Sequence, residues 1–360
     1  MSMPIVEHVL KAKAFLEATR GRVVLDVRSP KEYAEGHIPG AVSFPLFTDD
    51  ERAAVGTTYK QIGKSEAINA GLSFVGPKLQ SLAAQARDLF EGQASPQPLL
   101  IYCWRGGMRS GSLDWLLRTS QIPTMRCEGG YKACRAVYNE VLEAPRPYVV
   151  VGGMTGSGKT EIIHSLKRMG EGVVDLEGLA RHFGSAFGNL EDTPQPSTAH
   201  FANVLASELM KLDAAQTNGP IWVENESRQI GNVHMPEGFH KRQRSAPTLE
   251  IERLDEDRVN HLISMYGGAS IESLVEAFER IRTKLGGQHA NQAIAHLRAG
   301  DLASAARIAL VYYDKTYRHG LDQRNAKPVD GRGCNANDIA RKCMDVHNKW
   351  NPWNLPQKSN

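Results

Sequence analysis

The sequence predicts an α/β protein with two successive parallel-sheet domains and a helical C-terminal region. Short apolar runs typical of buried strands alternate with segments of helical periodicity over residues 1–250, which favours parallel sheets with helices on both faces. A proline-rich stretch at residues 144–147 (APRP) marks a junction, and helical periodicity alone continues after Pro247. We therefore expect domains at residues 1–144, 145–250 and 251–360, with the last packed on the second.

Composition excludes several classes of protein. The 41% hydrophobic content of the 360 residues suffices for folded cores, and a net charge of +3 is too small for a surface that is basic throughout. The five cysteines are odd in number and form no CxxC pair, which argues against a disulfide scaffold or zinc ribbon and favours a reducing cytoplasm. No apolar run approaches the ~18 residues of a membrane-spanning helix, so we expect no membrane partner.

The first domain begins with a predicted helix at residues 6–18 and a buried strand at residues 23–27. Polar residues surround the end of this strand, and we expect Asp26, Arg28, Glu32 and His37 to bond one another and hold loops together rather than to catalyse. Residues 46–73 are polar and interrupted by glycines, and we expect irregular structure there.

Cys103 stands where a predicted strand at residues 98–102 passes into a helix expected to start at residue 112. Two glycines allow a tight turn between them that aims backbone N–H groups inward. Arg105 and Arg109 add positive charge, and the helix N-terminus adds a partial one. All of these features lower the pKa of a thiol, so the loop is predicted to hold a reactive thiolate next to an anion.

Two alternatives remain for this loop. CWRGGMRS at residues 103–110 also fits the loop of cysteine phosphatases, although Tyr102 stands where that family usually has a histidine. Cys103 could also be an inert core thiol, a reading that the surrounding glycines and arginines disfavour. Cys127 and Cys134 lack such surroundings and are predicted to be core thiols. A role for Cys127 as the resolving cysteine of Cys103 is the alternative.

Three motifs in the first domain resemble the rhodanese family. They are DVRSPKEYAEGHIPGA at residues 26–41, the six-residue loop at residues 103–108, and EGGY at residues 128–131. The resemblance implies that Cys103 carries sulfur or selenium as a persulfide or perselenide. It also implies that the N–H groups of the loop hold the bound atom.

The second domain opens with a phosphate-binding motif. An apolar strand at residues 148–151 runs into GGMTGSGKT at residues 152–160, and a helix is predicted to follow. This is a complete P-loop in its strand–loop–helix context, whose N–H groups and lysine bind phosphate oxygens. The expected phosphate or diphosphate ligands are Gly153, Thr155, Gly156, Ser157, Gly158, Lys159 and Thr160. Thr160 is the candidate Mg²⁺ ligand. The alternative to a P-loop is a glycine-rich turn that contains a lysine by chance.

Acidic residues follow two further predicted strands of this domain. Asp175 and Glu177 come after an apolar run at residues 173–174, and Glu224 ends the run at residues 221–224. We expect them, together with Glu226 and Arg228, to support the phosphate site, because strand carboxyl ends are where site residues gather. The alternative is a loop of solvated charges.

The C-terminal region is predicted to contain four successive helices at residues 254–266, 271–285, 289–299 and 302–319. Basic residues accumulate there, and tyrosines and histidines lie among them. The basic residues are Arg280, Arg282, Lys284, Arg298, Arg307, Lys315, Arg318, Arg324 and Lys327. Positive charge binds phosphates and aromatic rings stack on bases, so this combination suits single-stranded RNA. Composition equally allows a solvent-exposed charged face whose tyrosines belong to the core.

Taken together, the rhodanese-like motifs, the P-loop, DLEGLA at residues 175–180 and ENESRQIG at residues 224–231 resemble the tRNA 2-selenouridine synthase family over nearly the full chain. The resemblance implies geranylation of 2-thiouridine at the tRNA wobble position by geranyl diphosphate. Selenium from selenophosphate, carried by Cys103, then replaces the geranylthio group. One departure is Phe183, where the family pattern predicts a basic residue.

The same resemblance sets the expected partners. These are tRNA-Lys, tRNA-Glu and tRNA-Gln carrying 2-thiouridine, with selenophosphate synthetase as a candidate protein partner and no tightly bound cofactor. We expect a cytoplasmic monomer. The rival function is a rhodanese-type sulfurtransferase fused to an ATP-dependent kinase or switch domain, and a phosphate-binding regulatory module without catalysis is a third.

Overall fold

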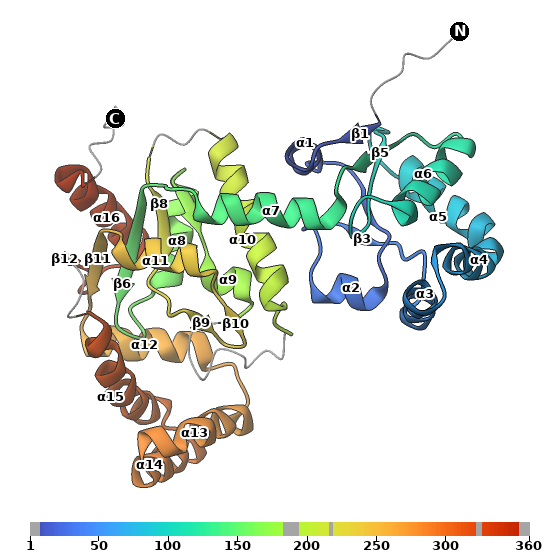
Figure 1. Ribbon diagram of the computed structural model, residues 1–360. Coiled ribbons are helices and arrows are strands. Elements are labelled where there is room, and N and C mark those ends of the chain that lie inside the picture. Colours follow the sequence, from blue (N-terminus) through green and yellow to red (C-terminus); the bar gives the residue numbers. More distant parts are fainter. Residues whose placement is uncertain (1–7, 183–193, 216–218, 322–325, 353–360) are drawn as a thin grey trace. The chain divides into compact units, whose positions relative to one another are not determined.

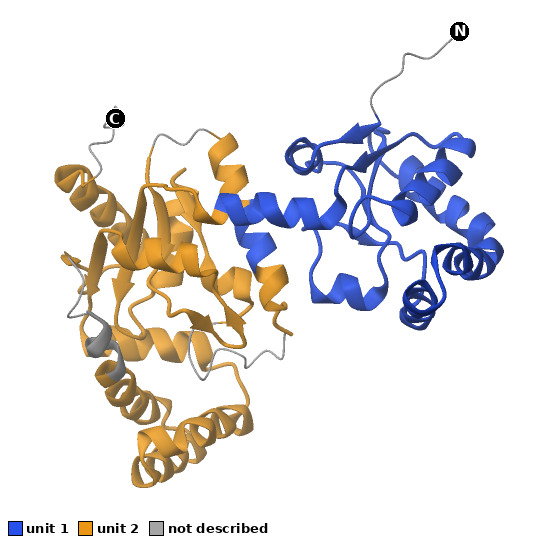
Figure 2. Cartoon of the chain, viewed as in Figure 1, with its two compact units in different colours: residues 1–141, 202–207 blue, residues 142–201, 208–360 orange. Residues whose placement is uncertain are grey.

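The computed structural model describes residues 8–182, 194–215, 219–321 and 326–352. The chain divides into two compact units, one made of residues 1–141 and 202–207 and the other of residues 142–201 and 208–360 (Figures 1 and 2). Each unit contains one five-stranded sheet whose strand pairs are all parallel. The predicted fold class is therefore confirmed.

The sheet of the first unit has the strand order β1-β5-β4-β2-β3. Its strands are β1 (Val9–Leu10), β2 (Val24–Asp26), β3 (Val42–Ser43), β4 (Leu99–Tyr102) and β5 (Thr124–Cys127). All four residues of β4 are buried, as expected for a central strand with covered faces. The Cys103 loop thus follows a strand in the middle of the sheet.

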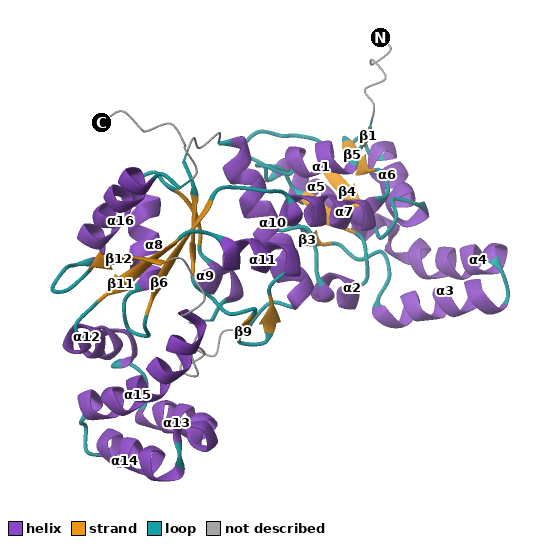
Figure 3. Ribbon diagram, turned by 60° about the vertical axis from the view of Figure 1, so that its left-hand side comes forward, coloured by secondary structure: helices purple, strands orange, loops and turns teal. Residues whose placement is uncertain are grey.

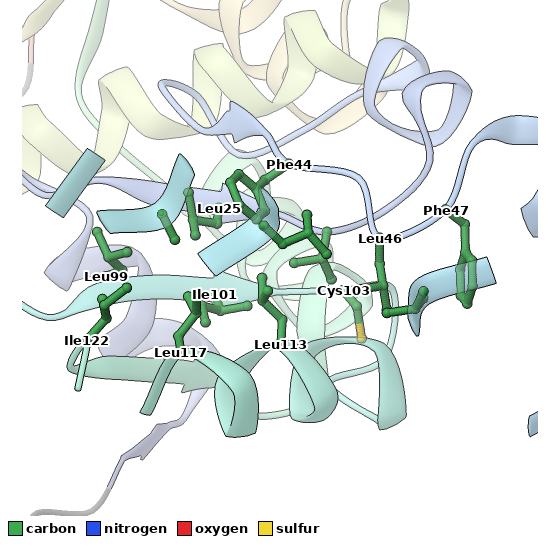
Figure 4. Close-up of a cluster of buried hydrophobic side chains, with 14 residues drawn as sticks. Leu25, Phe44, Leu46, Phe47, Leu99, Ile101, Cys103, Leu113, Leu117 and Ile122 are labelled. Atoms are coloured by element: carbon green, nitrogen blue, oxygen red, sulfur yellow. The ribbon is translucent and has the colours of Figure 1, made fainter. Parts of the chain in front are cut away.

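Helices cover this sheet. They are α1 (Ala12–Ala18), α2 (Pro30–Glu35), α3 (Asp49–Gln61), α4 (Lys64–Val75), α5 (Leu79–Glu91), α6 (Met108–Thr119) and α7 (Gly130–Glu143), with a 3₁₀ turn at Gly76–Lys78. Alternate strand residues such as Leu99 and Ile101 join Leu113 and Leu117 of α6 in one buried cluster (Figure 4). Cys103 belongs to this cluster, so its backbone is fixed by the core.

Two expectations for this unit were wrong. The region expected to be irregular forms the helices α3 and α4, because Thr48 and Glu51 make a capping box that starts a helix despite the polar composition. The helix expected from residue 6 begins only at Ala12, since Val9 and Leu10 pair with β5 as an edge strand. The capping box outweighs the polar composition in the first case, and the strand pairing outweighs the helical periodicity in the second.

The sheet of the second unit has the order β12-β11-β6-β8-β7. Its strands β12, β11 and β6 are labelled in Figure 3. Its strands are β6 (Tyr148–Gly153), β7 (Gly172–Val174), β8 (Ile221–Glu224), β11 (Thr248–Glu252) and β12 (Ala326–Asp330), and β9 (Gln229–Ile230) and β10 (Val233–His234) form a separate antiparallel pair. Because β6 lies between β8 and β11, the P-loop that follows it is flanked by the ends of both strands.

The two faces of this sheet are covered by different helices. Val149 and Val151 pack with α8 (Lys159–Arg168) and α16 (Ala336–Trp350), whereas Tyr148 contacts Phe239 of α11 (Glu237–Ser245) with ring centroids 5.4 Å apart. The remaining helices near the sheet are α9 (Leu176–Ala180) and α10 (Thr198–Ala214). In the parts of the chain that the structure describes, no helix is both long and apolar enough to cross a bilayer.

The four helices expected after Pro247 are present as α12 (Asp255–Tyr266), α13 (Ile271–Leu285), α14 (Gly287–Arg298) and α15 (Leu302–Leu321). The last three pack together around a core of their own (Figures 1 and 3). The region is not helical throughout, since β12 adds an edge strand to the P-loop sheet. Sequence analysis missed β12 because Pro328 argues against a strand, yet proline is tolerated at an edge.

Candidate functional site

Cys103 lies directly after β4, and its Sγ is 3.2 Å from the Ser110 hydroxyl oxygen. The residue is only 3% exposed. Helix α6 begins at Met108 and not at residue 112 as expected, because Gly107 already serves as its N-cap. Arg109 and Ser110 are consequently first-turn residues, and the partial positive charge of the helix N-terminus lies beside the thiol.

The loop is held from the other side by the turn that starts α7. The backbone N–H of Tyr131 donates to the Cys103 carbonyl at 2.8 Å, and that of Lys132 donates to the Trp104 carbonyl at 3.0 Å. Gly130 has a φ of 60°, and a Cβ there would overlap the Cys103 carbonyl oxygen. The EGGY motif therefore has a structural purpose, since only glycine lets this turn approach the loop so closely.

The two arginines of the loop differ in their surroundings. Arg109 is half-buried and forms an ion pair with Glu32, with 2.6 Å between Nη1 and Oε2. Burial alone would raise the pKa of Glu32, but the hydrogen bond and charge of Arg109 lower it. Arg105 is exposed. Glu32 thus fixes Arg109 in place, and Arg105 is the arginine whose side chain faces solvent.

Asp26 and Arg28 form the scaffold that their positions predict. Both are fully buried, and Arg28 Nη2 lies 2.6 Å from Asp26 Oδ2. The Tyr102 hydroxyl donates to the same carboxylate at 2.7 Å and accepts from the Ile38 N–H at 3.1 Å. Burial raises the pKa of Tyr102 well above its ordinary value, so it stays a neutral donor. These two hydrogen bonds explain why a tyrosine, Tyr102, precedes Cys103.

His37 and Glu32 complete the scaffold through contacts with nearby backbone. The His37 ring stacks on Tyr33 at 3.7 Å, and its Nδ1 is 2.9 Å from the Tyr33 carbonyl oxygen. Glu32 accepts from the Ser29 N–H at 3.1 Å in the capping box of α2. The expectation that these residues hold loops together is confirmed.

The P-loop connects β6 to α8 as predicted, and α8 begins at Lys159. The Lys159 ammonium donates to the Gly153 carbonyl at 3.2 Å and so spans the loop. The Thr160 hydroxyl donates to Glu177 Oε2 at 2.8 Å. The motif therefore brings its charge and its hydroxyl group to the end of the sheet where the acidic residues lie.

Three carboxyl groups meet at this edge. The Glu177 N–H donates to Glu224 Oε2 at 3.1 Å, and Glu226 shares a hydrogen bond with Glu177. Burial, followed by the neighbouring carboxylates, raises the pKa of Glu224 well above its usual range, and burial with Glu177 raises the pKa of Glu226 to about 8. Lys159 opposes this trend at Glu226 without cancelling it. Burial and the closeness of the carboxyl groups outweigh the charge of the nearby lysine, so the cluster keeps protons to higher pH than isolated carboxyl groups do.

The other two predicted supporting residues have different roles. Asp175 caps α9 by accepting from the Gly178 N–H at 2.7 Å, and its other oxygen is 2.7 Å from His164 Nε2. Its charge still contributes to the raised pKa of Glu177 and Glu224. Arg228 is exposed. Lys241 is the main cause of the lowered pKa of Glu237 in α11, and the charge of Arg228 adds to it. Arg228 is thus the predicted residue that the structure does not tie to the carboxylates.

Two basic residues beside the P-loop, Arg253 and His261, were missed by sequence reasoning. A Cβ on Gly158 would lie 3.5 Å from Arg253 Nη1 and 3.6 Å from His261 Cε1. Burial is the largest cause that lowers the pKa of His261, and the charges of Arg253 and Lys159 lower it further. Arg253 directly follows β11, and its position after a strand could have identified it as a site residue. His261 lies within α12, and nothing in the local sequence marks it as a site residue.

The basic C-terminal side chains are partly paired. Arg282 bonds to Glu279 at 2.5 Å and Arg307 to Glu256 at 2.9 Å, and Lys327 lies 4.7 Å from the centroid of the Trp350 ring. The side chains of Arg318 and Arg324, like Phe183, lie outside the described residues. An RNA-binding face on these helices stays a prediction.

Comparison with known families matches both units. The tRNA 2-selenouridine synthase AAA domain model matches residues 146–279, and the rhodanese-like domain model matches residues 10–159. The two models occur in the order that the motifs predict. This chain belongs to the tRNA 2-selenouridine synthase family. Family membership identifies a tRNA-modifying enzyme of the sulfur or selenium transferase type.

Two solved structures are also similar to parts of this family member. The N-terminal domain of a putative ATP/GTP binding protein from Clostridium difficile 630 is 41% identical, with 36% of this chain and 96% of that chain covered and a TM-score of 0.33. An uncharacterized protein from Eubacterium ventriosum ATCC 27560 is 8% identical, with 57% and 99% covered and a TM-score of 0.26.

The close approach of Gly130 to the loop predicts a large loss of stability on adding one methyl group. We expect Gly130→Ala to lower the free energy of unfolding by about 3 kcal/mol, because the new Cβ meets backbone at a positive φ. The control is Gly107→Ala, where a Cβ meets nothing within 4 Å. Urea denaturation of both variants measures the difference, and equal midpoints would contradict the packing described.

The raised pKa of Glu226 predicts a pH-dependent stability. The folded protein keeps a proton on this carboxyl that the unfolded chain releases, so the free energy of unfolding falls as pH rises from 4.5 to about 8. We expect Glu226→Gln to flatten this slope by up to ~1.4 kcal/mol per pH unit. Thermal denaturation between these pH values tests this, with the exposed Glu276→Gln as control. Parallel curves for wild type and Glu226→Gln would rule the prediction out.

Proposed function

We propose that this chain converts 2-thiouridine at the wobble position of tRNA into 2-selenouridine in two steps. Geranyl diphosphate first alkylates the sulfur, and selenium from selenophosphate then replaces the geranylthio group. The observation that supports this best is the fusion of a cysteine loop, cradled by N–H groups, with a P-loop bordered by a carboxyl cluster. One site suits a chalcogen and the other a diphosphate.

In the first step the thiouridine sulfur attacks the first carbon of the geranyl chain, the carbon–oxygen bond breaks, and diphosphate leaves with the electron pair while the ring N3 loses its proton. Charge builds up on the departing oxygens. Lys159 and the P-loop N–H groups would neutralise it, with Arg253 as a second cation beside Gly158. Nothing in this step requires hydrolysis of ATP.

An Mg²⁺ ion at Thr160 fits the carboxyl cluster. Glu224 Oε1 is buried with no hydrogen-bond partner, and burial and then the neighbouring carboxylates raise the pKa of Glu224 and Glu226, so a bound cation would stabilise their ionised forms. Within the described residues no group of three or more His, Cys, Asp or Glu side chains is arranged to hold a metal alone. Mg²⁺ usually takes one or two protein oxygens and completes its shell with phosphates and water, so Thr160 and Glu177 would suffice.

In the second step hydrolysis of selenophosphate releases phosphate and hydroselenide. Hydroselenide attacks the Cys103 sulfur in a mixed disulfide with a small thiol, the small thiol leaves, and Cys103 carries a perselenide. The perselenide selenium attacks the ring carbon that bears the geranylthio group, the carbon–sulfur bond breaks and geranylthiolate leaves. The small thiol then attacks the Cys103 sulfur, which frees the selenouridine selenium and restores the mixed disulfide. An apolar hollow of about 730 Å³, open to solvent, borders the first turn of α6. Met108, Trp115 and Phe47 help to line it, a surface that suits the departing hydrocarbon group.

The partners are those that the family resemblance implies. We propose tRNA-Lys, tRNA-Glu and tRNA-Gln with 2-thiouridine as substrates, a cytoplasmic location, and a monomer supplied by selenophosphate synthetase. The rival, a sulfurtransferase fused to an ATP-dependent domain, differs in needing ATP and no tRNA. ATP turnover without tRNA would favour that rival.

Single substitutions should separate the two steps. Thiolated tRNA, geranyl diphosphate and selenophosphate are incubated with each variant, and the nucleosides are analysed by mass spectrometry. We expect Lys159→Ala to lose geranylation by about a hundredfold or more, because the diphosphate charge is no longer balanced, and to convert pre-geranylated tRNA normally. The matched control is Lys167→Ala, an exposed lysine of the same helix. Equal loss of both steps in Lys159→Ala would indicate a shared RNA or phosphate site.

Cys103→Ala should show the opposite behaviour. We expect geranylated tRNA to accumulate without selenouridine, since the carrier atom is absent while the P-loop is intact. Cys334→Ala, which removes a half-buried thiol from the other unit, should retain both steps. Selenouridine formed by Cys103→Ala at the normal rate would show that Cys103 is not the carrier.

A further inference from the structure

Three titratable side chains meet beside Gly158 of the P-loop. A Cβ on Gly158 would lie 3.5 Å from both Arg253 Nη1 and Glu161 Oε2, and 3.6 Å from Cε1 of the His261 ring. Because Cε1 lies between the two ring nitrogens, the nitrogen-bearing edge of the ring faces the loop. Gly158 is the N-cap of α8, the end of the helix at which a phosphate group would bind. Two basic side chains and one carboxyl group therefore border the phosphate site.

Two polar atoms of this group are buried without a hydrogen-bond partner among the residues that the structure describes. They are Glu161 Oε2 and Arg253 Nε. His261 Nε2 is 3.5 Å from Glu161 Oε2, too far for a well-formed hydrogen bond. Since buried polar groups are normally bonded, the unpartnered atoms point to a place for a proton and an anion. A proton on His261 Nε2 would turn its contact with Glu161 into an ion pair.

Helix α12, which carries His261, is bonded directly to the P-loop. One turn before His261, Arg258 is 2% exposed, and its Nε donates to the Thr155 carbonyl at 2.9 Å. Gly156 has a φ of 80°, and a Cβ there would lie 2.9 Å from the Arg258 carbonyl oxygen. His261 is therefore held at a fixed place beside the loop.

The charges around His261 favour a neutral ring until an anion binds. Burial is the largest cause that lowers the pKa of His261, and Glu161 opposes it. The charges of Arg253 and Lys159 lower the pKa further. The other charged groups on or against α12 pair with one another: Arg253 with Asp257, Arg258 with Asp255 and Asp314, and Arg307 with Glu256. An anion on the P-loop would offset the two cations and so favour protonation of the ring.

We propose that His261 takes up a proton when a phosphate group binds the P-loop and is the acid that gives this proton to the departing diphosphate. As an imidazolium it would be held by Glu161 and would bond a phosphate oxygen. When the carbon–oxygen bond breaks, the electron pair stays on the diphosphate oxygen, the proton passes from a ring nitrogen to the diphosphate, and the imidazole is neutral again. The inference rests on the proposed function and adds to it the source of a proton for the leaving group.

Calorimetry on the full chain tests the proton uptake with inorganic pyrophosphate as the probe. Binding is measured near neutral pH in two buffers of different ionisation enthalpy, which gives the number of protons taken up. The wild type should take up about one proton more than His261→Gln, because the protonation of pyrophosphate itself contributes equally to both. His289→Gln, the same change at an exposed histidine of α14, should match the wild type.

His261→Lys separates positive charge from proton transfer. Since lysine is already charged, this variant should bind pyrophosphate without the extra proton. Geranylation by the wild type should slow as pH rises, because only the protonated ring can donate. We expect His261→Gln to lose about a hundredfold in rate together with this pH dependence, and His261→Lys not to regain the rate, because an ammonium group holds its proton more tightly.

The outcomes separate this inference from the proposed function. Equal proton uptake by the wild type and His261→Gln, or equal rates of geranylation, would overturn the role of His261 and leave the P-loop assignment intact. Failure of the wild type to bind pyrophosphate would overturn the diphosphate site itself.

A measurement on the unaltered protein guards against misfolding of the variants. If neither His261 variant folds, NMR of ¹⁵N-labelled histidine side chains in the wild type decides. An imidazole that gains a proton when pyrophosphate is added supports the assignment, and a spectrum in which no imidazole does so contradicts it.

Discussion

Parallel pairing of β6 with β8 and β11 places Lys159, Glu224 and Arg253 at one edge of the second sheet. These residues are distant in sequence, and nothing local brings them together. Because all strands of the sheet run the same way, every residue that follows a strand contributes to the same edge. The first unit obeys the same rule, since Cys103 follows β4 and Arg28 lies just beyond the end of the neighbouring β2. The sheet order therefore determines which side chains can cooperate.

The charges at the two edges are balanced in different ways. At the Cys103 loop the ion pairs are internal, since Arg28 is satisfied by Asp26 and Arg109 by Glu32. At the P-loop, Lys159 bonds a backbone carbonyl while the carboxyl groups of Glu224 and Glu226 have raised pKa values. Such a cluster favours a bound proton or cation, and a diphosphate ligand with its counterion would supply charge of both signs. The arginines near Cys103 are therefore held by internal ion pairs. The carboxyl groups near the P-loop are not fully balanced by internal charges, which favours a charged ligand there.

Much of this architecture was predictable from sequence because glycine motifs and strand ends carry local signals. The P-loop, the Cys103 turn and the scaffold role of Asp26 and Arg28 were found in this way. Other features depend on distant partners. Arg253 becomes a phosphate-site candidate only through the place of β11 beside β6, and β12 exists only because β11 offers it an edge. The pairing of Arg109 with Glu32 likewise links residues far apart in the chain. Periodicity and local motifs report only on neighbouring residues, so they cannot predict contacts between distant parts of the chain.

The P-loop alone does not determine which phosphate compound this protein uses, because its N–H groups and lysine bind any phosphate in similar fashion. Selection has to come from whatever surrounds the organic part of the ligand. Here the helical region is bonded to the loop, since Arg258 of α12 donates to the Thr155 carbonyl at 2.9 Å and to Asp314 of α15 at 3.0 Å. The helical region expected only to bind RNA therefore also holds the backbone of the phosphate loop in place.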